Sequence, residues 1–428
     1  MPSTRPIEGS DQFSQPRPTR GLRVVIDLRP LQCPERAPVT AHYLGGLLSA
    51  YAAEPLEGES FVVLLQTDLP DPTEDVGGLP VVGKRWIPPT SALRSAALTF
   101  EPFLLRGASI ATARGAGGQA VYHLAGARQP LASRLPVVAT LLDLAPWELP
   151  HVFQTSPAAQ FGERLRSRML QGAAAVIVGT ESTARTATKL VHVHPNRLHV
   201  IPLPPQPAMS SIRGGGAALT EAIAAERRRL GLPDRYLVFT GRYDARTDLP
   251  TLFEALAQLR DKPRPKDLAA DAGWPPSVVM ASARPEDIAA LARAATREGL
   301  TALLTYTPEL PVGRLATLIA GARAALVPSV SDAAGLAAID AIACGTPVIA
   351  SAVGALPEIV ASTGVVVESR DPARLARAIE AVWSDDRLHK TLADAITAQP
   401  RPSWSEVARQ TREVYAQVAA RRAGMPLR

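Results

Sequence analysis

Short apolar runs rich in Val, Ile and Leu alternate with longer amphipathic runs along the chain from Arg23 onward. A short apolar run predicts a buried strand, and strands that alternate with helices predict parallel sheets covered by helices on both faces. In the first half, the predicted strands are 23–28, 60–65, 121–123, 137–142, 174–178 and 198–201, and a helix is predicted at 41–53. In the second half, they are 236–240, 277–281, 302–305, 324–327, 347–350 and 364–367. The pattern therefore predicts an α/β fold with two doubly wound, Rossmann-like domains.

The alternation is interrupted between Pro202 and Gly216, where the sequence PLPPQPAMSSIRGGG holds four prolines and three consecutive glycines. This composition is typical of an exposed linker or hinge. A chain of 428 residues is also longer than the roughly 250–300 residues at which a single core stops growing. We place a leader at 1–22, the first domain at 23–204, the linker at 205–217, the second domain at 218–385 and a last segment at 386–428. Two such domains place a ligand cleft between the carboxyl ends of their facing sheets.

Charge and cysteine content narrow the class of protein. The 46 basic and 40 acidic residues leave a net charge of +6, and no dense basic run with interleaved aromatic residues occurs. Solvated charge accounts for this balance more simply than a nucleic-acid or anionic-lipid surface, and we expect no nucleic-acid partner. The two cysteines, Cys33 and Cys344, lie far apart without metal-ligand spacing. They favour a reduced, cytoplasmic location.

The first 22 residues are rich in Pro, Ser and Arg and lack the apolar core of a signal peptide, so we expect a disordered leader. No apolar run approaches the roughly 18–20 residues that span a bilayer. Any membrane contact is therefore expected to be peripheral, at the inner face of the membrane.

The stretch from Asp332 to Val360, DAAGLAAIDAIACGTPVIASAVGALPEIV, carries the strongest chemical signal. Gly335 and Leu336 begin an amphipathic run, so the first free amides of that helix would face an anion such as a phosphate. Asp332 and Asp340 are eight residues apart and can face one cleft. Their carboxylates would accept hydrogen bonds from sugar or ribose hydroxyls.

This stretch resembles the donor-binding motif of the family-4 (group 1) retaining glycosyltransferases of GT-B fold, E-G-F-G-L-x-x-x-E-A-M-A-x-G-x-P-V-I-A. Other segments resemble the family in the same order, among them VIDLRPLQ, RLPVVATLLDLAPWELP, AAAVIVGTESTARTATKL and VFTGRYDARTDLPTLFEAL. The last, SWSEVARQTREVYAQV, resembles the helix that crosses back onto the first domain in this fold. The resemblance implies two domains facing a central cleft and transfer of a hexose, with retention, from a nucleotide-sugar. It implies no metal or other cofactor, and an acceptor that is a glycan, a lipid-linked molecule or a small molecule, in polysaccharide biosynthesis.

The resemblance also assigns roles to individual residues. It implies catalytic roles for Arg242, which follows a strand and would hold the diphosphate, and for Asp332. It places Arg246, Gly335, Leu336, Asp340, Tyr306 and Glu358 at the donor, with Asp340 on the ribose and Tyr306 in the loop that meets the base. Sugar or acceptor contacts are expected from His123 and Asp143. Each of three residues has an alternative role. His123 could be a buried structural residue with its hydrogen bonds made, Glu358 could cap a helix, and Arg246 could be a solvated loop residue.

The chain departs from the family motif at several ligand-facing positions. Both motif glutamates are the aspartates Asp332 and Asp340, the lysine of the R-K-N segment is Thr247, and the histidine of V-H-D is Leu142. The Gly-x-Gly loop after the first strand is replaced by RAPVTAHY, residues 36–43. Two hypotheses follow: a transferase with a divergent donor site, or a non-catalytic relative that acts as a binding or scaffold protein in envelope or polysaccharide metabolism.

Overall fold

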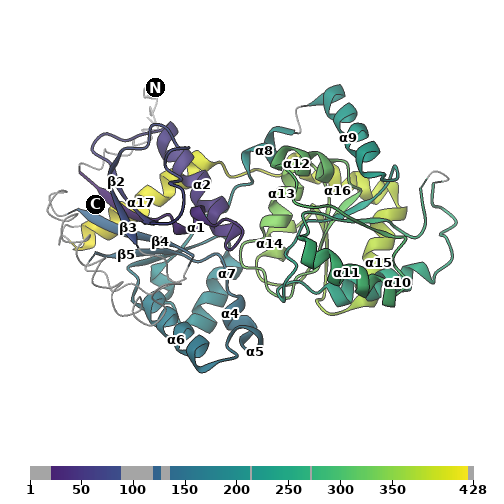
Figure 1. Ribbon diagram of the computed structural model, residues 1–428, viewed down its shortest axis with the longest axis horizontal. Helices are drawn as coiled ribbons and strands as arrows, with labels where there is room; N and C mark the ends of the chain where they lie inside the picture. The colour runs from purple at the N-terminus through teal and green to yellow at the C-terminus, as the bar shows by residue number, and fades with distance from the viewer. Residues whose placement is uncertain (1–20, 88–118, 127–134, 213–214, 270–271, 423–428) are drawn as a thin grey trace, which may run out of the picture.

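The computed structural model describes residues 21–87, 119–126, 135–212, 215–269 and 272–422. Within them, the apolar runs form two wholly parallel sheets, each at the centre of its own domain. Figure 1 shows the two domains side by side, with the purple-to-teal part of the chain mainly in one and the green-to-yellow part mainly in the other, while the yellow helix α17 (Trp404–Arg422) lies back in the first. The predicted fold, two Rossmann-like α/β domains, is confirmed.

The first domain has a seven-stranded sheet in the order β3-β2-β1-β4-β5-β6-β7. Its strands are β1 Arg23–Asp27, β2 Ser60–Gln66, β3 Val81–Ile87, β4 Ala120–Ala125, β5 Val137–Thr140, β6 Ala175–Val178 and β7 Leu198–Val200. Its helices are α1 Arg29–Gln32, α2 Pro38–Ala53, α4 Ala145–Glu148, α5 Pro150–Phe153, α6 Pro157–Gly172, α7 Glu181–Thr186, the π-helix η1 Ala187–Val191 and the 3-10 helix η2 Pro195–Arg197. The strand order reverses direction between β1 and β4, which opens a crevice at their carboxyl ends.

Strand β3 is absent from the sequence-based prediction. It lies at the edge of the sheet and pairs only with β2, and its residues Val82, Lys84, Arg85 and Trp86 are exposed. An edge strand faces water along most of its length and can carry charged side chains. Periodicity analysis that looks for buried apolar runs therefore overlooks it.

The second domain repeats the same topology with six strands, in the order β10-β9-β8-β11-β12-β13. The strands are β8 Leu237–Phe239, β9 Val278–Met280, β10 Leu304–Tyr306, β11 Ala324–Val327, β12 Val348–Ser351 and β13 Gly364–Val367. The helices that cover this sheet are α8 Pro207–Ser211, α9 Gly216–Leu230, α10 Leu249–Arg260, α11 Pro285–Arg297, α12 Val312–Ala320, α13 Leu336–Cys344, α14 Leu356–Val360, α15 Pro372–Ser384 and α16 Asp386–Ala398. Here the order reverses between β8 and β11, so this domain also has a crevice at its carboxyl edge.

The chain passes between the domains twice, and both passages differ from the predicted boundaries. Residues 203–205 of the linker are buried, not exposed, and Pro207–Ser211 is already helix α8, packed on α12 and α13. Trp404 donates a hydrogen bond from Nε1 to the carbonyl of Pro205 (3.1 Å), and His42 Nε2 lies 2.9 Å from the carbonyl of Pro204. The two passages are therefore packed together, against α2.

The last segment divides between the domains. Helix α16 packs against α15 and places Ile396 in the core of the second domain, and only α17, Trp404–Arg422, crosses to the first. The crossing therefore lies after Ala398 and not at residue 386. In Figure 1 α17 is the yellow helix within the first domain. No helix of the described ranges is both long and apolar enough to cross a membrane.

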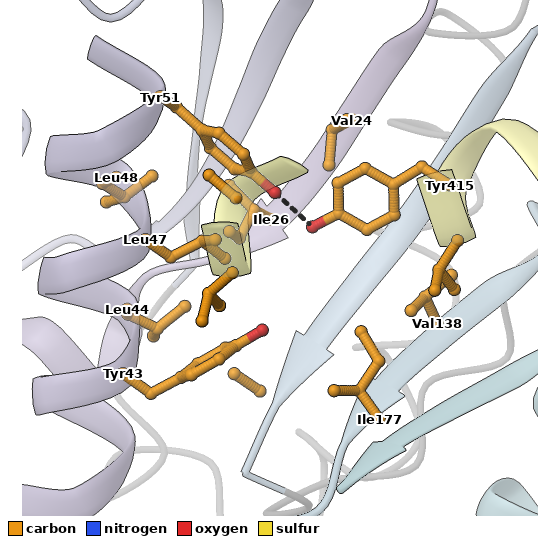
Figure 2. Close-up of a cluster of buried hydrophobic side chains, with 14 of the residues drawn as sticks. Val24, Ile26, Tyr43, Leu44, Leu47, Leu48, Tyr51, Val138, Ile177 and Tyr415 are labelled. Carbon is orange, nitrogen blue, oxygen red and sulfur yellow. Dashed lines mark hydrogen bonds between the residues drawn. The ribbon is translucent and has the colours of Figure 1, made fainter. Parts of the chain in front are cut away.

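A buried polar network fixes α17 to the first domain. Arg412 donates two hydrogen bonds to the carboxylate of Glu59 (2.7 and 3.0 Å), and both side chains are nearly inaccessible to solvent. Figure 2 shows the hydroxyl of Tyr51, on α2, against that of Tyr415, on α17, at 3.3 Å among Leu and Val side chains. His123 completes this network, with Nδ1 2.5 Å from the hydroxyl of Tyr415.

Candidate active site

A cleft of about 500 Å³ lies between the two domains. Its walls come from the carboxyl ends of β5 and β8, from the residues after β11 and from the first turns of α2 and α13. This is where two doubly wound sheets that face each other place a ligand. The cleft brings together Asp143, Arg242, Arg246, Leu336 and Asp340 with Asp332.

Two glycines with left-handed backbone shape the loop that leads into α13. Gly354 has φ +53°, and a Cβ there would overlap the carbonyl oxygen of Asp332, which accepts a hydrogen bond from the N–H of Ala355 (2.8 Å). Gly335 has φ +65°, and a Cβ there would overlap the side chain of Ile359. Glycine is the residue that adopts this conformation without strain. The glycines of the motif thus hold Asp332 and the start of α13 in place.

Asp332 occupies part of the anion site that was predicted at the start of α13. Its Oδ1 accepts hydrogen bonds from the N–H groups of Gly335 (2.7 Å) and Ala334 (3.3 Å). The next amides, those of Leu336 and Ala337, meet no acceptor in the described part of the chain. Burial raises the pKa of the Asp332 carboxyl, although these two N–H groups act to lower it. The free anion-binding amides therefore begin at Leu336, one residue later than predicted.

Asp340 lies on α13 and is only 7% exposed. Its Oδ1 accepts a hydrogen bond from the backbone N–H of Gln206 (3.2 Å), and its Oδ2 accepts one from the Gln206 side chain (3.4 Å). Burial raises the pKa of Asp340 to about 7, although both contacts with Gln206 lower it. The carboxylate predicted to meet a ribose is thus bound to the linker between the domains.

Arg242 follows β8 and lines the cleft. Its Nε donates a hydrogen bond to Oδ2 of Asp244 (2.9 Å). Its two terminal nitrogens make no hydrogen bond with any residue that the structure describes, and 38% of the side chain is exposed. Arg242 therefore presents unoccupied donors to the cleft, which is the arrangement that a phosphate oxygen needs.

The loop that carries Arg246 is anchored to the residues after β11. Thr247 and Ser329 form an antiparallel bridge, and the carbonyl of Arg246 accepts a hydrogen bond from the N–H of Val330 (2.8 Å). These bonds place Arg246 in the same cleft as Asp332.

The Arg246 side chain is fully engaged with other residues. It donates two hydrogen bonds to Asp143 (2.6 and 3.3 Å), which follows β5 in the first domain, and one to Asp244 (2.8 Å). Its guanidinium also lies over the ring of Phe153, 4.6 Å from the centroid. Arg246 is therefore no solvated loop residue, because it links the two domains across the cleft.

The first domain contributes a mainly apolar wall. Leu141 and Leu142 are buried at the end of β5, and Pro38 and Val39 begin α2 where the family has its Gly-x-Gly loop. None of these side chains can donate a hydrogen bond to a phosphate or a sugar. Polar groups of this domain that also line the cleft are Arg36, Thr40, Asp143, Glu163 and Arg166, so both domains contribute hydrogen-bonding groups.

Three of the predicted site residues lie elsewhere. His123 sits inside β4, fully buried, with Nε2 2.8 Å from Thr140 Oγ1, and burial lowers its pKa to about 3. The expectation that it faces the cleft is wrong, because its side chain points to the face of the sheet that α17 covers. Tyr306 ends β10 at the far edge of the second sheet and is not part of the cleft wall.

Glu358 has the capping role that the sequence left open, but it caps a helix of the other domain. Its two carboxylate oxygens accept hydrogen bonds from the N–H groups of Glu181 (3.1 Å) and Ser182 (3.0 Å), at the start of α7. A carboxylate at a helix N-terminus is stabilised by the free amides and by the helix dipole. Glu358 lies outside the cleft wall and contributes to the contact between the domains.

Three residues of the site were not predicted from the sequence. Asp244 lies two positions from both Arg242 and Arg246, a spacing that could have revealed it. Gln206 lies in a segment predicted to be an exposed linker. Glu148, on α4, accepts a hydrogen bond from Ser331 across the interface between the domains, and burial raises its pKa. Nothing in the sequence near Glu148 signals this contact.

Comparison with known proteins shows which proteins this chain resembles. Residues 214–399 match the family described as glycosyl transferases group 1. The D-inositol 3-phosphate glycosyltransferase of Xylanimonas cellulosilytica is 31% identical over 261 residues, which is 58% of each chain. This chain thus spans somewhat more than half the length of that relative. Residues 214–399, which contain Asp332 and Arg242, are therefore similar to the group 1 glycosyltransferases.

Solved structures extend the likeness to both domains. Sucrose-phosphate synthase from Thermosynechococcus elongatus superposes with a TM-score of 0.67 at 22% identity, over 94% of this chain and 100% of that one. Anabaena HepE, solved in complex with UDP-glucose, gives a TM-score of 0.63 at 16% identity, over 92% of this chain and 99% of that one. At such identities the likeness concerns the fold, which is GT-B. Among the described residues no group of three or more His, Cys, Asp or Glu side chains is placed to hold a metal ion.

Proposed function

We propose that this protein transfers a hexose from a nucleotide-sugar to an acceptor hydroxyl, with retention at the anomeric carbon. The observation that carries the proposal is a cleft between the domains in which Arg242 and the amides of Leu336 and Ala337 present unoccupied donors. Cleavage of a nucleotide-sugar leaves a diphosphate, and fixed positive charge with oriented N–H groups stabilises the charge that develops on it. The group 1 match over 214–399 supports this assignment.

The residues of the cleft divide the work of donor binding. Arg242 and the start of α13 would hold the diphosphate. The Oδ2 atom of Asp332, which has no partner in the described residues, would accept a hydrogen bond from a hydroxyl of the transferred sugar. Asp340 would accept hydrogen bonds from the ribose in place of Gln206. The leaving phosphate itself would take the proton of the acceptor hydroxyl, so the proposal needs neither an enzymic base nor a metal.

The acceptor would bind on the side of the first domain. That wall is apolar around Leu142 and Val39, and Asp143 is one of its polar groups, together with Arg36, Thr40, Glu163 and Arg166. Asp143 would contact a sugar or acceptor hydroxyl. A glycan, a lipid-linked molecule and a small molecule all remain acceptor classes within the proposal, and its place is the cytoplasm, with membrane contact at most peripheral.

The test is a thermal-shift screen against UDP-, GDP- and ADP-sugars, followed by a turnover assay with the sugar that binds. A donor present at about 100 times its Kd should stabilise the folded protein by about 2.7 kcal/mol. Release of the matching nucleoside diphosphate in the presence of an acceptor would establish transfer. If no nucleotide-sugar binds at millimolar concentration, the proposal is wrong.

A second candidate function, a non-catalytic binding protein of the same fold, is favoured by one observation. Carboxylates of the protein already occupy the groups that a donor needs, since Asp143 and Asp244 hold Arg246 while Asp332 holds the amide of Gly335. A protein that binds a nucleotide-sugar but releases no nucleoside diphosphate with any acceptor would fit this second function.

A further inference from the structure

Arg242 and Arg246, two of the four arginines that line the cleft, differ in how far they are free to bind a ligand. Arg242 uses one nitrogen on Asp244, and its two terminal nitrogens have no partner in the described ranges. Arg246 directs Nε and both terminal nitrogens at carboxylate oxygens, two of them on Asp143. A diphosphate can therefore reach Arg242 directly, whereas at Arg246 it competes with two carboxylates for the guanidinium.

Asp143 is the replaceable partner of Arg246. Its side chain is 48% exposed, and its other hydrogen bond is the one it accepts from the N–H of Ala145 (3.0 Å). Asp244, in contrast, belongs to the same loop as both arginines and accepts hydrogen bonds from Arg242 Nε and from the backbone N–H of Arg246 (3.0 Å). Burial would raise the pKa of Asp244, but these groups hold it below its usual value. An incoming anion would thus displace Asp143 first.

The geometry of the pair resembles the one a phosphate would adopt. Asp143 binds Arg246 through two nearly parallel N–H···O contacts, and a phosphate presents two oxygens to a guanidinium in the same way. We propose that Asp143 sets the affinity of this cleft for nucleoside diphosphates, by occupying Arg246 until the diphosphate exchanges with it. The inference rests on the proposed function, because it takes the ligand to be a nucleotide donor.

The exchange has a second consequence for the site. Once Arg246 turns to the diphosphate, the Asp143 carboxylate is released at the end of β5, on the acceptor side of the cleft. It is then free to accept a hydrogen bond from a hydroxyl. Asp143 thus becomes available to an acceptor hydroxyl only after the donor has bound.

Isothermal titration of UDP, GDP and ADP, and of the corresponding nucleosides, tests this exchange on the full chain. The nucleoside diphosphate that binds the wild type should bind Asp143→Asn about tenfold more tightly, since a competing charge on Arg246 is gone. The affinity for the nucleoside should not change. Asparagine keeps an oxygen to accept the N–H of Ala145, so the end of β5 is preserved.

Glu148→Gln is the matched control. Glu148 is another first-domain carboxylate that bonds across the interface, to Ser331, but it does not touch Arg246. If the gain came from a loosened contact between the domains, Glu148→Gln would produce it too, and the inference would be overturned. In the double variant Asp143→Asn with Arg246→Ala the gain should vanish, because the arginine that was freed is no longer present.

The remaining outcomes separate the inference from the function it rests on. Equal affinity of wild type and Asp143→Asn for the nucleoside diphosphate would overturn the role of Asp143 while leaving the proposed function intact. If neither protein binds any of the three nucleoside diphosphates although both unfold cooperatively, the proposed function fails and the inference fails with it.

Discussion

Arg412–Glu59 and Arg246–Asp143 are two of the arginine–carboxylate pairs that join distant parts of this chain, and they differ in almost every physical respect. Arg412 and Glu59, between α17 and the first domain, have side chains that are 7% and 0% exposed. Arg246 and Asp143, across the cleft, have side chains that are 18% and 48% exposed. The first pair is enclosed by Tyr51 and further buried side chains, whereas the second borders a cleft of about 500 Å³.

The difference in burial decides which of the two ion pairs is permanent and which can exchange its partner. No solvent reaches the pair at α17, so breaking it leaves an uncompensated charge in the core. The pair in the cleft borders solvent, so water or a ligand can replace either partner at small cost. The same chemistry thus fixes a helix at one place and leaves a binding group available at the other.

The strongest test of the comparison is Glu59→Ala. It leaves Arg412 buried without its carboxylate, and we expect it to lower the free energy of unfolding by about 3–5 kcal/mol. Urea denaturation measures this loss. Glu406→Ala, on α17, removes one of the two carboxylates that pair with the exposed Arg409 and should cost no more than about 1 kcal/mol. Equal losses from the two variants would remove the distinction between buried and exposed pairs.

Asp340 is buried like the Arg412–Glu59 pair, but it lines the cleft like the Arg246–Asp143 pair. The dependence of stability on pH reports on its burial. Its pKa rises from 3.8 to about 7 on folding, mainly through burial. Between these values the folded protein binds a proton that the unfolded chain does not, so Asp340 makes stability fall as pH rises through this window. Asp340→Asn should therefore be more stable than the wild type at pH 8, by about 4 kcal/mol, and nearly equal to it at pH 4.

Thermal unfolding of the wild type and Asp340→Asn across this pH range makes the measurement. A constant difference between the two proteins at all pH values would mean that Asp340 does not titrate in the window.

Ligand binding by Arg242 tests whether the cleft holds exchangeable binding groups. Arg242→Ala removes the group whose terminal nitrogens face the cleft, and it should weaken binding of a nucleoside diphosphate about ten- to a hundredfold. Titration calorimetry gives the affinity. Arg228→Ala, an exposed residue of α9 that pairs with Glu221, is the control and should bind as the wild type does. Unchanged binding in Arg242→Ala would reject Arg242 as a diphosphate ligand.

The smallest effect is expected when the Arg246–Asp143 pair is broken and the free energy of unfolding is measured. Asp143→Asn should change the free energy of unfolding by less than about 1 kcal/mol, because the pair is partly exposed. Urea denaturation beside the Glu59→Ala protein makes the comparison direct. A loss of 3 kcal/mol or more would place this pair with the permanent contacts.

The fold could be predicted from the sequence because its strands are buried on both faces. Continuous apolar runs such as those of β1, β6 and β11 correspond closely to the observed strands. The exposed edge strand β3 carries Lys84 and Arg85 and lacks this signal. The bounds of the linker were wrong because Pro204 and Pro205 are buried, and Trp404 bonds to Pro205 across about 200 residues, a contact that local composition does not contain.

The backbone arrangement of the site could be predicted from the sequence, but the contacts between its side chains could not. The spacing of Asp332, Gly335 and Asp340 indicated a helix start that faces a cleft, and the structure has one there. That Gln206 binds Asp340, or that Asp143 binds Arg246, depends on the packing of two domains against each other. No pattern within either segment encodes such contacts.

The place of α17 has a consequence for how the protein is made. The first domain covers one face of its sheet with residues 404–422, which the ribosome delivers after the whole second domain. At about 5–20 residues per second, the 222 residues between β7 and the end of α17 (422 − 200 = 222) take roughly 10 to 45 seconds to synthesise. During that interval Tyr51, His123 and Glu59 lack their final partners, and nascent first domains are exposed to association with one another or capture by chaperones until α17 arrives.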